Sequence, residues 1–188
     1  MEKEFAIEDN KLGNKRKDVL SWDESFMLHA IVASGRSKDP NSQVGACIVD
    51  KNNRILSLGY NGSPNEWDDN NFPWDRDNED AKTNKYPYVI HAEMNALLNY
   101  KGSNKDLEGA TLYVTLFPCH ECAKFLAQAG IKKIIYLSNK YKDTDDNKMS
   151  RICLNYCGIE YKQIDLSTEY ILSLNSNNKE YIKKLTSK

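Results

Sequence analysis

Long apolar runs and an excess of charge of one sign are both missing from this 188-residue sequence. No stretch approaches the roughly 20 apolar residues that a bilayer-spanning helix needs, and no apolar signal segment follows the charged start Met1–Glu4. The formal net charge is −1, so the chain lacks the positive field of a protein that coats DNA or RNA. We therefore expect a cytoplasmic protein with no membrane partner, and the charge argues against a nucleic-acid partner.

A regular disulfide framework is also absent. The cysteines are odd in number and irregularly spaced, which fits reduced thiols or metal ligands better than the paired cysteines of secreted domains. The five are Cys47, Cys119, Cys122, Cys153 and Cys157.

The pattern along the chain predicts one α/β domain over residues 19–168, preceded by a polar tail (1–18) and followed by a C-terminal extension (169–188). Ser21 and Glu24 have the spacing of a capping box, which predicts a first helix up to Gly35. Residues 61–86 have no periodicity and predict a long functional loop. The other expected elements are a hairpin of strands (44–50, 54–60), helices (91–100, 120–129), strands (111–117, 132–138), and a last helix and strand ending near 164.

Two short motifs carry the residues typical of a metal site. His91-Ala92-Glu93 and Pro118-Cys119-His120-Glu121-Cys122 both precede a helical pattern. Because Cys119 and Cys122 are three residues apart at a helix start, their sulfurs share one face, and the positive helix end favours thiolates. Two thiolates and the His91 imidazole are good Zn²⁺ ligands, and three protein ligands leave the fourth position for water.

Glu93 lies two residues after His91, close enough to exchange protons with that water without binding the metal. Taken alone, each motif has a plainer interpretation, because a C-x-x-C pair is often structural or redox-active and a lone histidine is often a core residue. Together, in this order, they match the H-x-E and P-C-x-x-C pattern of zinc-dependent nucleobase deaminases.

Around these motifs the sequence resembles the deoxycytidylate (dCMP) deaminases of the cytidine deaminase superfamily over about residues 20–165. The resemblance implies a three-layer α/β/α fold with a mixed five-stranded sheet and a homo-oligomer, commonly a hexamer. It also implies hydrolysis of dCMP to dUMP and ammonia, which supplies thymidylate synthesis, with Glu93 as the proton carrier. The matching blocks are Ser37–Ala46, Gly59–Gly62, Tyr86–Tyr88, His91–Ala96 and Phe117–Ile131.

The same resemblance implies substrate contacts. Asn61 matches the asparagine that holds the sugar 3′-hydroxyl in this family. For the 5′-phosphate we expect the loop at the end of the first helix, with Arg36, Ser37 and Asn41, and Tyr141 on the opposite side.

Resemblance to the regulated dCMP deaminases further implies activation by dCTP and inhibition by dTTP, with Mg²⁺ as a candidate ion bound with the nucleotide effector. Glu66 occupies a position where the family has glycine, and we expect it to weaken effector binding. The residues that fit the effector loop are Gly59, Tyr60, Asn61, Gly62, Pro64, Asp68 and Asp69.

Three alternatives keep part of this interpretation. The substrate could be cytidine or dCTP, or a cytosine base in a nucleic acid, although a base-editing enzyme is expected to carry a basic groove. A catalytically silent, zinc-stabilised assembly module is the third alternative, and the presence of Glu93 opposes it.

Cys153 and Cys157 are four residues apart and could form half of a second zinc site with His29 or Cys47, with core packing as the default.

Overall fold

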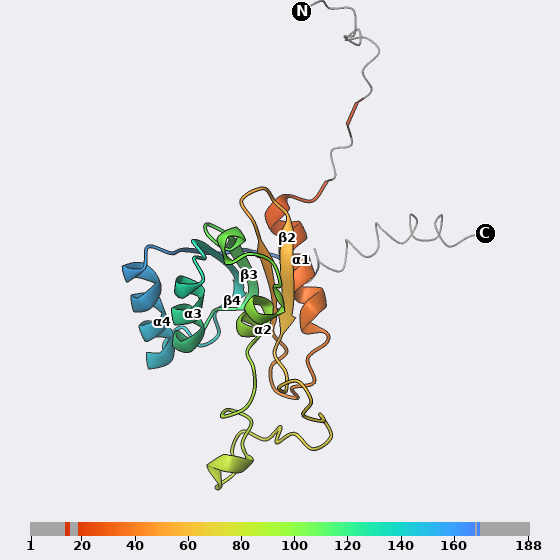
Figure 1. The fold of residues 1–188 in the computed structure, drawn as a ribbon, viewed down its shortest axis with the longest axis vertical. Helices are drawn as coiled ribbons and strands as arrows, with labels where there is room; N and C mark the ends of the chain where they lie inside the picture. Colours follow the sequence, from red (N-terminus) through yellow and green to blue (C-terminus); the bar gives the residue numbers. More distant parts are fainter. Residues whose placement is uncertain (1–13, 16–18, 168, 170–188) are drawn as a thin grey trace, which may run out of the picture.

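Five strands form one mixed sheet in the order β2-β1-β3-β4-β5 in the computed structural model, which describes residues 14–15, 19–167 and 169 (Figure 1). Strand β1 pairs antiparallel with β2 and β3, whereas β3, β4 and β5 run parallel. This confirms the predicted α/β fold with a mixed five-stranded sheet. The strands are β1 Gly45–Val49, β2 Ile55–Tyr60, β3 Thr111–Leu116, β4 Lys133–Ser138 and β5 Glu160–Gln163.

Helices cover both faces of the sheet, which gives the three layers. Successive residues of β1 point to opposite faces: Cys47 packs with α1, and Ile48 packs with α2 and α3. All five residues of β1 are buried, as expected for a strand covered on both sides. The helices are α1 Trp22–Ser34, α2 Ala92–Asn99, α3 His120–Gln128 and α4 Asp145–Tyr156, with short 3₁₀ turns η3 Ala81–Thr83 and η4 Asn104–Asp106.

Local sequence signals account for the element ends. Ser21 caps α1 as predicted, since its Oγ accepts from Glu24 N–H and its N–H donates to Glu24 Oε2 at 2.6 Å. The predicted helices and strands agree with the observed ones to within one or two residues. Most of the expected tail (1–18) and extension (169–188) lies outside the described residues.

Gly59 allows α2 to lie directly against the sheet. A Cβ at this position would come within 2.3 Å of Ala92 O and of Ala96 N. Because α2 begins beside His91, this close approach fixes the height at which the helix N-terminus sits over the strands. Gly59 therefore has a packing function that positions the site.

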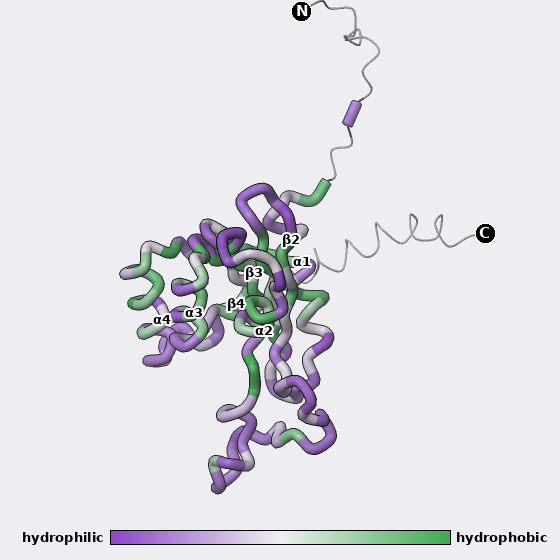
Figure 2. Tube along the Cα trace, viewed as in Figure 1, coloured by the Kyte–Doolittle hydropathy of each residue, from purple (hydrophilic) through white to green (hydrophobic). Residues whose placement is uncertain are grey.

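The predicted long loop extends from the strand edge after β2 and returns before α2 (Figure 1). A bridge between Gly62 and Ile90 closes its base. The tube in Figure 2 is mostly hydrophilic along this loop, with green confined to short stretches. Four aromatic rings with centroids 4.5–5.2 Å apart give the loop a small core, comprising Trp67, Phe72, Trp74 and Tyr88. Among the described residues, no helix is long and apolar enough to cross a membrane.

Candidate metal centre and active site

The N-termini of α2 and α3 carry the two sequence motifs. His91 is the residue before α2, and Cys119 is the residue before α3. Cys119 caps its helix with sulfur, because Cys122 N–H donates to Cys119 Sγ over 3.4 Å. The helix ends place the ligand residues, and their partial positive charge favours thiolates there.

The three ligand atoms converge. His91 Nδ1 lies 3.4 Å from Cys119 Sγ and 3.4 Å from Cys122 Sγ, and the three ligand atoms all lie within 4.8 Å of one another. Tetrahedral zinc with bonds of about 2.3 Å to sulfur and about 2.0 Å to nitrogen separates such atoms by about 3.5 Å. The residues therefore fit a zinc ion, with one coordination position left for water.

The charges of this cluster also call for a cation. The contact with Cys122, together with the one to His91, lowers the pKa of the Cys119 thiol to about 4 against the effect of burial. The contact with Cys119 raises the pKa of His91 to about 9. The same sulfur contact and burial raise the pKa of Cys122. A divalent cation bound here would stabilise both sulfurs as thiolates.

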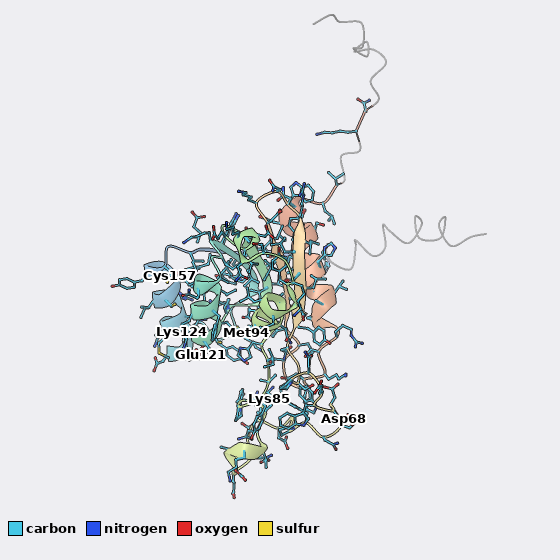
Figure 3. All side chains as sticks on the ribbon, in the orientation of Figure 1. Asp68, Lys85, Met94, Glu121, Lys124 and Cys157 are labelled. Atoms are coloured by element: carbon cyan, nitrogen blue, oxygen red, sulfur yellow. The ribbon has the colours of Figure 1, made fainter. Side chains whose placement is uncertain are left out.

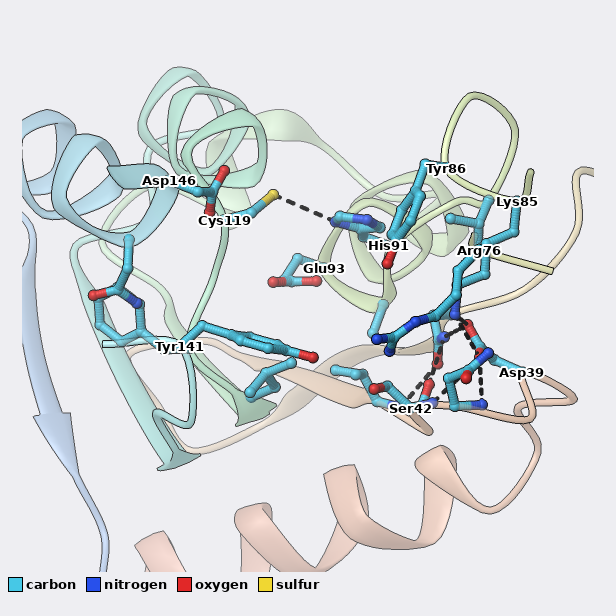
Figure 4. A pocket seen from close by; sticks show the side chains of 18 of the residues that line it. Asp39, Ser42, Arg76, Lys85, Tyr86, His91, Glu93, Cys119, Tyr141 and Asp146 are labelled. Carbon is cyan, nitrogen blue, oxygen red and sulfur yellow. Dashed lines mark hydrogen bonds and ion pairs between the residues drawn. The ribbon is translucent and has the colours of Figure 1, made fainter. Parts of the chain in front are cut away.

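Glu93 stands beside the cluster without belonging to it. It lies in the first turn of α2, only 3% of its surface is exposed, and burial raises the pKa of its carboxyl to about 7. Figure 4 shows its carboxylate pointing into the open space between His91 and Tyr141. A buried carboxyl in this position can accept and return a proton next to the metal.

A cavity of about 390 Å³ opens in front of these groups, a size typical of small-molecule sites. Its walls come from the α1–β1 connection, the long loop, and the segment between β4 and α4 (Figure 4). The lining residues outside the metal cluster are Asp39, Asn41, Ser42, Val44, Asn61, Arg76, Lys85, Tyr86, Val89, Ala92, Glu93, Leu116, Phe117, Tyr141, Thr144, Asp146 and Asn147.

Two helices that begin over a mixed sheet carry a zinc-compatible His-Cys-Cys cluster and an adjacent buried glutamate. This combination is typical of zinc-dependent nucleobase deaminases. Comparison with known proteins narrows this class. A family model described as "Cytidine and deoxycytidylate deaminase zinc-binding region" matches residues 20–138. The chain belongs to the cytidine and deoxycytidylate deaminase family, and the family match supports zinc as its metal.

Individual relatives of the chain are named as members of the same family. The chain is 45% identical to human deoxycytidylate deaminase, over 91% of this chain and 96% of the human protein. It is 47% identical to a probable deoxycytidylate deaminase of Drosophila melanogaster, over 80% of this chain and 75% of that protein. Among solved structures, the dCMP deaminase of cyanophage S-TIM5 in complex with dCMP and dUMP has a TM-score of 0.59 at 34% identity. That match covers 75% of this chain and 95% of the phage chain.

The residues predicted to contact substrate fall into two groups. Asn41, Asn61 and Tyr141 line the cavity. Ser37 supports the wall from behind, because its Oγ donates to Asn61 O at 2.8 Å, and it does not line the cavity. Arg36 is exposed outside the cavity, where its charge acts on Asp69.

The residues predicted to bind effectors lie mostly away from the cavity. Asn61 is the member of this set that lines it. Asp69 is paired with Lys38 and accepts from Ser63 Oγ at 2.7 Å, and Asp68 caps the turn at Asn70. The other predicted members, Gly59, Tyr60, Gly62 and Pro64, form the end of β2 and the start of the long loop.

Glu66 adopts a glycine-like backbone conformation. Its φ is +70°, in the left-handed region that an L side chain occupies at a cost. The glycine that the resemblance implies at this position would adopt this conformation at no steric cost. The substitution therefore leaves backbone strain in the loop.

Four charged residues of the cavity were missed by the sequence interpretation: Asp39, Lys85, Arg76 and Asp146. Burial alone would raise the pKa of Asp39, but hydrogen bonds from Lys85 and from backbone N–H groups hold it below its ordinary value. Asp39 lies within a sequence block typical of the family, and Lys85 directly precedes another such block. These positions were the sequence signal that could have identified both residues. Lys85 lies in the long loop, where Figure 3 labels it. Arg76 lies in the same loop, and nothing in the loop sequence distinguishes it from its charged neighbours.

The remaining cysteines form no second metal group within the described part of the chain, where the His91, Cys119 and Cys122 group is the candidate found. Cys47 is fully buried in the α1 face of the core. Cys157 is exposed at the end of α4, on the outer side of the molecule (Figure 3). His120, which lies between the metal-ligand cysteines, pairs with Asp146 and Glu121.

Proposed function

We propose that this protein catalyses the hydrolytic deamination of dCMP to dUMP and ammonia. The observation that carries the proposal is a single cavity with a zinc-type cluster and Glu93 at one end and cationic side chains at the other. The named relatives are deoxycytidylate deaminases, and the phage neighbour carries dCMP and dUMP. We call the group His91, Glu93, Cys119 and Cys122 the metal end of the cavity.

Hydrolysis at this end requires protons to be moved at fixed places. His91, Cys119 and Cys122 would hold the zinc ion, which would supply a water molecule of lowered pKa. Glu93 accepts the proton that this water gives up as its oxygen attacks C4 of the base. Glu93 passes this proton to ring N3, then takes the proton of the new C4 hydroxyl and delivers it to the amino nitrogen, so that the C4–N bond breaks, ammonia leaves and the C4 carbonyl forms. The apolar side chains of Val44, Leu116 and Phe117 line the cavity beside it and suit a pyrimidine ring.

Another part of the wall suits a phosphate. It consists of Ser42, Arg76 and Tyr141, which line the cavity, and of Lys140, which does not line it but contacts Ser42 and Tyr141; we call these four residues the phosphate end. Lys140 Nζ donates to Ser42 Oγ at 3.0 Å and lies 4.9 Å from the centre of the Tyr141 ring. Burial would raise the pKa of Tyr141, but its contacts with Lys140 and Ser42 lower it. Figure 4 shows Arg76 extending from the long loop toward the same region.

These donors and positive charges recognise a dianion that a nucleoside lacks. The sequence interpretation assigned Arg36 to phosphate binding. We propose Arg76 and Lys140 for that role instead. Asn41 lines the same wall and, with Ser37 behind it, remains part of the proposed phosphate loop. A 5′-monophosphate is the anionic group that a small cavity can accommodate together with a base and a sugar.

The sugar is proposed to contact Asn61, which directly follows β2 and lines the cavity. A deoxyribose monophosphate has one free sugar hydroxyl, the 3′-hydroxyl. Asn61 Oδ1 already accepts from Val44 N–H at 2.8 Å, and its second lone pair can accept from that hydroxyl.

We further propose a cytoplasmic homohexamer that dCTP activates and dTTP inhibits, as the resemblance implies. The proposed effector site is the start of the long loop, where Mg²⁺ would bridge a triphosphate to Asp68 and Asp69. Because Asp69 is already engaged by Lys38 and Ser63, and Glu66 adds charge nearby, we expect a modest response. Saturation curves for dCMP with Mg²⁺, taken alone, with dCTP and with dTTP, test this; three superimposable curves would disprove it.

A substrate panel tests the main proposal. Zinc-loaded protein is assayed for ammonia release from dCMP, CMP, deoxycytidine, dCTP and single-stranded DNA at equal concentration. We expect dCMP to be the best substrate. Preference for another member would reassign the substrate within the family, and release from none would favour the silent assembly module.

A further inference from the structure

Asp39 joins three segments of the cavity wall through one buried carboxylate. Its Oδ1 accepts from the N–H groups of Asn41 at 2.8 Å and Ser42 at 3.2 Å, within its own loop. Lys85 Nζ, from the far end of the long loop, donates to Oδ1 at 2.7 Å and to Oδ2 at 2.6 Å. Oδ2 also accepts from Asn61 Nδ2 at 3.3 Å. Figure 4 shows these dashed contacts around Asp39 below Arg76.

The surroundings of Asn61 determine which way its amide faces. Its Nδ2 donates to Asp39 Oδ2 and to Ser42 O at 2.9 Å, while its Oδ1 accepts from Val44 N–H. A reversed amide would place Oδ1 against two acceptors and Nδ2 against an N–H donor. Both amide hydrogens are thus used within the protein, and the capacity left for a ligand is one lone pair on Oδ1.

We propose that Asp39, paired with Lys85, is a positioning residue that fixes the Asn61 amide so that it offers an acceptor to the substrate sugar. This pair thereby sets the preference for nucleotides with a 3′-hydroxyl, an inference that rests on the proposed function. Asp39 and Lys85 do not touch the reacting atoms. They act through Asn61, which does contact the substrate in the proposed complex.

Burial explains why the carboxylate and the ammonium occur together. Asp39 is 3% exposed and Lys85 is 5% exposed, so either charge alone would be buried without a counter-charge. Removing one partner would therefore test folding more than recognition. Both must be changed at once, with the shape of Asp39 retained.

The informative variant is Asp39→Asn combined with Lys85→Met. The introduced side-chain amide can still accept the two N–H groups of its own loop through its oxygen. Its NH₂ then replaces Oδ2 and faces the NH₂ of Asn61, so the Asn61 amide loses its fixed orientation. Neither charge of the pair remains.

The measurement is the ratio of kcat/KM for dCMP to kcat/KM for 2′,3′-dideoxy-CMP, which lacks the hydroxyl. We expect about tenfold preference for dCMP in the wild-type protein, as for one hydrogen bond to a desolvated partner. We expect a preference within about twofold in the double variant and in Asn61→Ala. Adding Asn61→Ala to the double variant should lower the ratio no further. Dissociation constants of dUMP and 2′,3′-dideoxy-UMP give the same comparison without turnover.

Gln43→Ala is the matched control. Gln43 donates to the backbone carbonyl of Asp39 from the same loop and is exposed. This variant should keep the wild-type ratio. A double variant that loses activity equally on both substrates, or that keeps the tenfold ratio, would overturn the inference and leave Asp39 a purely structural residue.

Two further results separate the possible failures. Wild-type protein that deaminates neither substrate would refute the proposed function itself. If thermal unfolding shows the double variant to be unfolded, Asp39→Glu with Lys85 retained keeps the charge pair and moves the carboxylate by one methylene. The inference then predicts a reduced ratio for Asp39→Glu, and an unchanged ratio would overturn it.

Discussion

The two ends of the cavity are built differently. The metal end stands on the first turns of α2 and α3, which are packed against the sheet through fully buried residues such as Ala92, Ala96 and Ala123. The phosphate end stands on connections between elements, including Arg76 on the long loop, with 46% of its side chain exposed. Chemistry thus rests on the rigid elements, and recognition of the nucleotide rests on segments that vary more readily.

Because of this difference, we expect the two ends to contribute to different properties of the enzyme, the metal end to turnover and the phosphate end to substrate recognition. A change at the metal end should reduce turnover of every substrate, because all share the same reaction. A change at the phosphate end should reduce only the use of substrates that carry the phosphate. The following predictions test this division, from the largest expected effect to the smallest.

Cys119→Ala should abolish activity and release zinc. Metal binding also contributes folding free energy, so we expect the melting temperature to fall by on the order of 10 °C or more. Metal content and thermal unfolding measure both effects. Cys157→Ala, at an exposed cysteine, is the control and should behave as wild type. A Cys119→Ala protein with one zinc per chain and unchanged melting would contradict the assignment.

Glu93→Gln should keep zinc and lose turnover. The amide has the size of the carboxyl but cannot carry the proton, which predicts a kcat lower by about two to four orders of magnitude. The assay is kcat for dCMP alongside metal content. Glu121→Gln, at an exposed residue of α3 paired with Lys124, is the control. Turnover of Glu93→Gln within tenfold of wild type would refute its role.

Arg76→Met should weaken use of dCMP by about ten- to a hundredfold in kcat/KM, since a charge-assisted contact to phosphate is lost. The matched substitution Arg36→Met, at an arginine outside the cavity, should cost much less. The comparison decides between the two arginines. If Arg36→Met has the larger effect, the phosphate binds at the end of α1, as the sequence interpretation had it.

Glu66→Gly should stabilise the protein slightly. Relief of the left-handed backbone at +70° outweighs the extra entropy of glycine in the unfolded chain, leaving a gain of up to about 1 kcal/mol. Urea unfolding with an unchanged m-value measures it. Glu66→Ala keeps a Cβ at this position and should bring no such gain; equal stabilisation by both would show that charge, not backbone strain, is responsible.

The same division explains what the sequence could predict. His91, Glu93, Cys119 and Cys122 lie in two short motifs at predicted helix starts. The three-residue spacing brings Cys119 and Cys122 to one face, and His91 and Glu93 both lie at the start of α2. The strands and helices followed from periodicity and capping, as at Ser21.

The phosphate end could not be derived in this way. Arg76 and Arg36 are both arginines in polar segments, and only the path of the long loop brings one of them to the cavity. The contact between Asp39 and Lys85 joins residues 46 positions apart, and no local pattern encodes such a pairing.

The most direct test of the two-ended cavity is the ratio of kcat/KM for dCMP to kcat/KM for deoxycytidine, measured in zinc-loaded wild type, Glu93→Gln and Arg76→Met. The account predicts that Glu93→Gln lowers both values and leaves the ratio unchanged, because both substrates need the same proton transfers. It predicts that Arg76→Met lowers the ratio about tenfold or more, because only dCMP carries the phosphate. Equal ratios in all three proteins would contradict it.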